Sequence, residues 1–142
     1  MPVERNFLLF KTDLFVFHQP DEDIDQWFVG GDCAGWFYAR LLPMPSIKRF
    51  CEPVMEDWGW TFGVCLADVR VWVSIWAYSV ENCWSFGVAS SKQFFRRQTD
   101  AILLGAKDKV CDALEGVVTE DSRFLKHQWF QSDPFDLNIK EF

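Results

Sequence analysis

The sequence has little that would support metal, redox or phosphate chemistry. It contains only 2 histidines in 142 residues, its 5 cysteines include no C-x-x-C pair, and no glycine-rich phosphate loop is present. An odd number of cysteines within apolar segments is typical of reduced, buried thiols rather than of a disulfide framework. We therefore expect no metal site and no cofactor.

Basic residues and long apolar runs are also scarce. The chain carries 14 Lys and Arg against 21 Asp and Glu, a net charge of -7, and a surface of that sign repels the phosphates of nucleic acids. No stretch approaches the roughly 20 apolar residues of a membrane span. The first residues also lack the basic and apolar segments of a secretory signal. We expect a cytoplasmic protein that binds neither nucleic acid nor membrane.

Aromatic residues, in contrast, are abundant. The chain has 15 Phe, 8 Trp and 2 Tyr, and 49% of its residues are hydrophobic, which excludes intrinsic disorder. A chain of this length can bury a core without disulfides or metal. The prediction is a single domain over residues 1–142, with a loose acidic tail from 132 to 142.

The centre of the chain predicts a three-stranded antiparallel meander. Residues 58–66, 69–78 and 83–89 each alternate large apolar side chains with smaller or polar ones. A short loop at 67–68 would place Leu66 opposite Val69, and the same register continues along both strands. One core face then collects the side chains of Trp58, Trp60, Phe62, Val64, Leu66, Val69, Val71, Val73, Ile75, Ala77, Trp84, Phe86 and Val88.

The same registers define a second face of this meander. They place Trp72 opposite Gly63 and Trp76 opposite Gly59, so that indole rings cover bare backbone. Two interpretations remain open. Either the N-terminal segment or the Trp27–Phe28 pair packs on this face, or the face is left for a partner.

The flanking segments complete the predicted fold. Residues 7–17 read as one or two strands, and a helix follows over 33–42 with Asp32 as its N-cap. Apolar spacings of three and four predict a helix from about 100 to 116–120, followed by a last strand over 123–130. The fold class is therefore α+β: an antiparallel sheet of about 5–6 strands with two helices packed on one face.

Cys33 is the candidate nucleophile, because a cysteine in the first turn of a helix can have a lowered pKa. The segment 31–36, Gly-Asp-Cys-Ala-Gly-Trp, resembles the Asp-Cys-Ser-Gly motif of bacterial cell-wall peptidases of papain-like fold. That resemblance implies a histidine base on the meander, yet no histidine lies between His18 and His127. We interpret Cys33 as a buried structural thiol. A small hydrolase or ligand-binding domain using Cys33 or the acidic loops stays the alternative.

A second resemblance concerns residues 53–60, Pro-Val-Met-Glu-Asp-Trp-Gly-Trp. After an Asp-capped helix and before an aromatic meander, this segment resembles small acidic bacterial proteins of the immunity type. The resemblance covers about residues 27–90. It implies a binder without chemistry of its own, which neutralises a cognate toxin in the cytosol.

The charge pattern leads to the same expectation. An acidic surface with exposed aromatic residues suits an inhibitor that docks on a basic cleft, because charge accelerates association and buried aromatics supply affinity. We predict a non-catalytic immunity protein. The partner-binding residues would be Asp21, Glu22, Asp23, Glu56, Asp57, Trp72 and Trp76.

Overall fold

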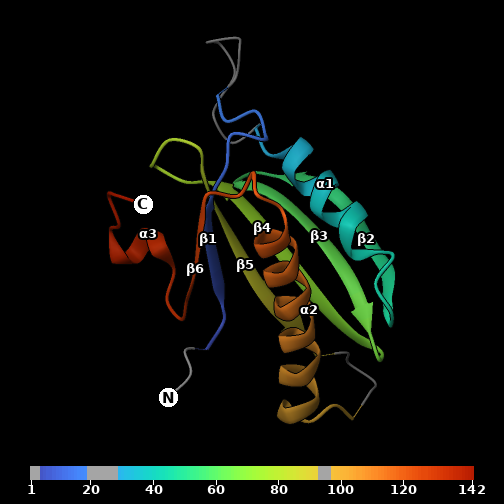
Figure 1. The fold of residues 1–142 in the computed structure, drawn as a ribbon. Coiled ribbons are helices and arrows are strands. Elements are labelled where there is room, and N and C mark those ends of the chain that lie inside the picture. The colour runs from blue at the N-terminus through green and yellow to red at the C-terminus, as the bar shows by residue number, and fades with distance from the viewer. Residues whose placement is uncertain (1–3, 19–28, 93–96) are drawn as a thin grey trace.

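A six-stranded antiparallel sheet forms the framework of the protein, in a computed structural model that describes residues 4–18, 29–92 and 97–142 (Figure 1). The strand order is β2-β3-β4-β5-β1-β6. The α+β prediction is confirmed. The elements are β1 (Phe7–Lys11), α1 (Gly31–Leu41), β2 (Ile47–Glu56), β3 (Gly59–Leu66), β4 (Val69–Ala77), β5 (Cys83–Ser91), α2 (Asp100–Glu120), β6 (Lys126–Phe130) and α3 (Pro134–Leu137).

Helices α1 and α2 cover one face of the sheet, as the apolar spacing predicts (Figure 1). Helix α2 begins at an N-cap, Thr99, whose hydroxyl accepts a hydrogen bond from the Ile102 N–H. Its buried stripe, which includes Val110 and Leu114, faces the strands. Helix α1 contributes Phe37 to the same core, and the ring lies 4.7 Å from that of Phe86 on β5.

The predicted meander is confirmed in register. Leu66 pairs with Val69 and Trp60 with Ile75, while on the next strand Trp84 pairs with Ala77. The loop between β3 and β4 is the two-residue turn expected, with positive φ at both Ala67 (48°) and Asp68 (64°). Because the loops preserve the alternation, the core side chains at alternate positions of β3, β4 and β5 share the helix-covered face, whereas Trp72 and Trp76 lie on the other face.

Of the one or two strands predicted over residues 7–17, one is present but is shorter, and the predicted N-cap of α1 needs correction. Only Phe7–Lys11 of the segment 7–17 is a strand, because the Thr12 hydroxyl donates to the Arg123 carbonyl and accepts from the Leu14 N–H, which turns the chain. Asp32 is not the N-cap, since α1 begins at Gly31 after Gly30, whose φ of 116° favours glycine. The Asp32 carboxylate instead accepts hydrogen bonds from the N–H groups of Cys33 and Val16.

Strand β2 was not predicted. It forms one edge of the sheet and, among the described strands, pairs only with β3. Its register shifts between Arg49 and Val54 surround Pro53. Bulges and a proline break the alternation from which strands are recognised, and they also hinder pairing with another chain. An edge strand of this kind therefore has a weak sequence pattern.

Trp58 and the C-terminal tail also differ from the prediction. Trp58 lies in the β2–β3 turn and is 41% exposed, so it does not belong to the core face. The tail from Ser132 is not loose, because it forms α3 and packs Ile139 and Phe142 against Leu9 and Tyr78. The Tyr78 hydroxyl lies within hydrogen-bond distance of two tail carbonyl oxygens, at 2.8 Å and 2.9 Å.

Candidate binding surface

The second face of the sheet, which α1 and α2 leave uncovered, carries the described part of the predicted site. Trp72 and Trp76 project from β4 on this face and are half-buried. Glu56 ends β2 and Asp57 lies in the following turn, and both are exposed. The other predicted residues, Asp21, Glu22 and Asp23, lie outside the described residues.

Glu56 and Trp76 lie on the same face, separated by a glycine. Glu56 pairs with Gly59 across the β2–β3 hairpin, and directly opposed residues point to one side of a sheet. On the other side of Gly59 lies Trp76, whose ring would be 3.5 Å from a Cβ at that position. Such a Cβ would also collide with the Ile75 carbonyl oxygen, so only glycine fits here. Glu56 and Trp76 therefore flank a strip of bare backbone.

Trp58 completes this end of the surface. Its ring packs on Trp76 with the centroids 5.0 Å apart and the planes tilted by 37°. Sequence alternation places Trp58 on the core face, but the turn rotates it out of the strand pattern. Asp57 and Gly59 are residue types common in turns, and they indicated in the sequence that Trp58 lies in a turn rather than in the strand.

The opposite end of the surface is built around Trp72. Its ring lies 5.2 Å from Phe50 of β2, and its indole N–H donates to the Ser91 hydroxyl. Arg70 stacks over Phe50 at 4.3 Å. Gly63 lies beneath, where an added Cβ would be 2.9 Å from the Phe50 ring. We call Phe50, Trp58, Trp72 and Trp76 the aromatic surface.

Strand β1 does not lie across the aromatic surface, so it is not the cover that one of the two interpretations of this face expected. Strand β1 lies within the sheet, between β5 and β6, because its backbone groups pair with both neighbours. Trp27 and Phe28 lie outside the described residues. The C-terminal tail packs instead on the β1–β5 end of the face, around Leu9 and Cys83.

A cavity of about 360 Å³ adjoins Trp76 at the point where β1 begins. Its apolar wall includes Phe7 and Ala89, and its polar wall includes Lys107. The Lys107 ammonium is hydrogen-bonded to the Asn6 side chain. This hollow extends the aromatic surface towards the first strand.

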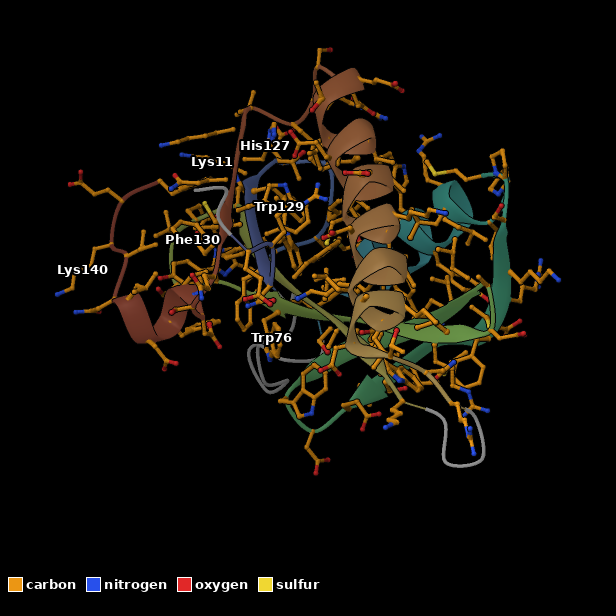
Figure 2. All side chains as sticks on the ribbon, turned by 90° about the horizontal axis from the view of Figure 1, so that it is seen from below. Lys11, Trp76, His127, Trp129, Phe130 and Lys140 are labelled. Carbon is orange, nitrogen blue, oxygen red and sulfur yellow. The ribbon has the colours of Figure 1, made fainter. Side chains whose placement is uncertain are left out.

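A polar cluster joins α2 to the outer strand β6 on the helix-covered side. The Glu115 carboxylate lies 2.9 Å from His127 Nε2 and accepts a 2.8 Å hydrogen bond from the Trp129 indole. Figure 2 shows both partners between β6 and α2, whereas Phe130 and Lys140 lie towards α3. Burial raises the pKa of Glu115, but the hydrogen bonds from His127 and Trp129 outweigh it and lower the pKa overall.

Cys33 lies in a setting that keeps its thiol protonated. Its side chain is fully buried, and burial, with Asp32 adding to it, raises the pKa of Cys33 well above its usual value. The two histidines of the chain contact carboxylates elsewhere: His18 contacts Glu81, and His127 contacts Glu115. Neither stands beside Cys33 as a base.

Within the described ranges, no group of three or more His, Cys, Asp or Glu side chains is placed to hold a metal ion. Among the same residues, no helix has both the length and the apolar character needed to cross a membrane. No protein-family model, curated protein or solved structure matches the chain.

Proposed function

We propose that the protein is a non-catalytic inhibitor of the immunity type, which binds a basic cognate toxin or effector in the cytoplasm and neutralises it. The observation that carries this proposal is the aromatic surface. Four large rings gather on one face of the sheet, and Trp58 and Phe50 are 41% and 37% exposed. Aromatic side chains at the centre of an interface supply most of its binding energy.

Charge supports a basic partner. The chain has a net charge of -7, and Glu56 and Asp57 border the Trp58 end of the aromatic surface. Complementary charge around an aromatic centre speeds association and excludes partners of the wrong sign. The fully buried, protonated Cys33 thiol is consistent with a protein that acts by binding rather than by catalysis.

The test is co-expression with the toxin domain encoded by the neighbouring reading frame. The wild-type protein should restore growth and co-purify with that domain. Trp58→Ala should weaken binding by about 30-fold or more, the loss expected for an aromatic residue at an interface centre. Leu104→Ala is the matched control, because Leu104 is an apolar residue of similar exposure on α2. Equal protection by both variants would remove the aromatic surface from the interface.

A further inference from the structure

Some of the partly exposed aromatic rings stack with cations of the protein itself. Four such stacks occur among the described residues. They are Arg5 over Trp129 at 5.6 Å, Arg40 over Trp36 at 4.2 Å, Arg70 over Phe50 at 4.3 Å and Lys126 over Phe142 at 4.4 Å. The Trp58–Trp76 pair has no cation from the described part of the chain.

That pair has carboxylates beside it instead. Asp57 precedes Trp58 in the turn, and Glu56 shares the face of Trp76 across Gly59. Adjacent strands are about 4.8 Å apart, so the Glu56 and Trp76 backbones are about 10 Å apart, with no side chain at Gly59 between them. An indole ring attracts a cation over its face, and a carboxylate binds the same cation through hydrogen bonds.

We propose that Trp58, Trp76, Glu56 and Asp57 form a recognition site for an arginine side chain presented by the partner. This inference rests on the proposed function and specifies the chemistry of its interface. A guanidinium is planar, so it can lie against an indole while its edge N–H groups reach the carboxylates. A lysine ammonium lacks both the flat surface and the fork of donors.

The first test measures arginine binding without the toxin. A protein labelled with ¹⁵N is titrated with the blocked peptide acetyl-Gly-Arg-Gly-amide, and the indole N–H signals are followed by NMR. The control peptide carries citrulline, which has the shape of arginine but no charge. The Trp58 and Trp76 signals should shift saturably and that of Trp72 should not. Arginine should bind about fivefold more tightly than citrulline.

Equal shifts with the citrulline peptide, or none up to about 50 mM arginine peptide, would overturn the inference. Replacing the two carboxylates together, as Glu56→Gln with Asp57→Asn, should abolish the preference for arginine. The control variant, Glu120→Gln with Asp100→Asn, makes the same charge change on α2 and should keep it. Circular dichroism of each variant checks that the fold is retained.

The second test separates this inference from the proposed function. If toxin binding falls with Trp58→Ala but not with Glu56→Gln and Asp57→Asn, the aromatic surface binds the toxin without an arginine. The proposed function then stands and the inference fails. If the carboxylate variant also weakens binding at least fivefold, and the α2 control does not, both are supported. If Trp58→Ala has no effect, both fail.

Discussion

Replacing Glu115 by alanine should loosen the outer strand β6 from α2. The change removes two hydrogen bonds to a carboxylate, from His127 and Trp129. Such bonds contribute about 1.5–3 kcal/mol each when buried, but the Glu115 side chain is 40% exposed and water screens it. We therefore expect a loss of about 2 kcal/mol for both together, which lowers Tm by about 4–8 °C in a chain of this length.

The effect of this substitution should depend on pH. The folded-state pKa of Glu115 is lowered, so its stabilising contribution is present above the unfolded pKa and is lost as pH falls through the folded value. The difference between wild type and Glu115→Ala should be largest near neutral pH and shrink in acid. The stability of Glu115→Gln should vary less with pH in acid than that of wild type, because its amide keeps a carbonyl acceptor but does not titrate.

Urea denaturation followed by circular dichroism at several pH values measures these differences. Glu120→Ala is the control, because Glu120 is an exposed glutamate near the end of the same helix. The same replacement there removes a carboxylate that makes no contact with β6. If Glu115→Ala and Glu120→Ala cost the same free energy, or if the Glu115→Ala loss grows in acid, the proposed role of this cluster is wrong.

Three further predictions concern packing. Gly63→Ala should destabilise the fold by about 1 kcal/mol or more, because its methyl group meets the Phe50 ring, whereas Gly116→Ala in α2 has open space and should stabilise by up to about 1 kcal/mol. Denaturation curves that move in the same direction for both would refute this. Tyr78→Phe removes the hydroxyl that binds the C-terminal tail, so iodoacetamide should label Cys83 about fivefold faster; an unchanged rate would show that the tail is held otherwise. In the folded wild type at pH 8, Cys33 should be the slowest of the cysteines to react, and mass spectrometry that finds it among the first labelled would contradict its buried, protonated state.

The central strands were predictable because their information is local. Large side chains alternate along β3, β4 and β5, and the Ala67–Asp68 turn joins two of these strands without breaking the alternation. Apolar residues spaced three and four apart likewise predict α2 from the sequence alone. Strand β2 carries no such pattern, because its bulges around Pro53 disrupt the period of two.

The candidate site was only partly predictable. The face of Glu56 was not predictable, because it depends on the pairing of β2 with β3. Trp72 and Trp76 follow from strand register, which fixes the face on which a side chain lies. Trp58 and Phe50 do not, because a turn and a bulge place them on the second face. Their membership of the aromatic surface depends on contacts across strands rather than on any spacing in the chain.

Composition and periodicity thus establish an acidic α+β domain with an aromatic meander. They suffice because the alternation of buried and exposed side chains is a local property of each strand. How the second face is covered depends on long-range packing. Strand β1 joins the sheet because its backbone gains partners on both sides, and the C-terminal tail packs near Tyr78 because apolar contacts and hydrogen bonds favour that position. These energies arise between segments far apart in sequence, so folding alone leaves the Trp58–Trp76 pair beside two carboxylates.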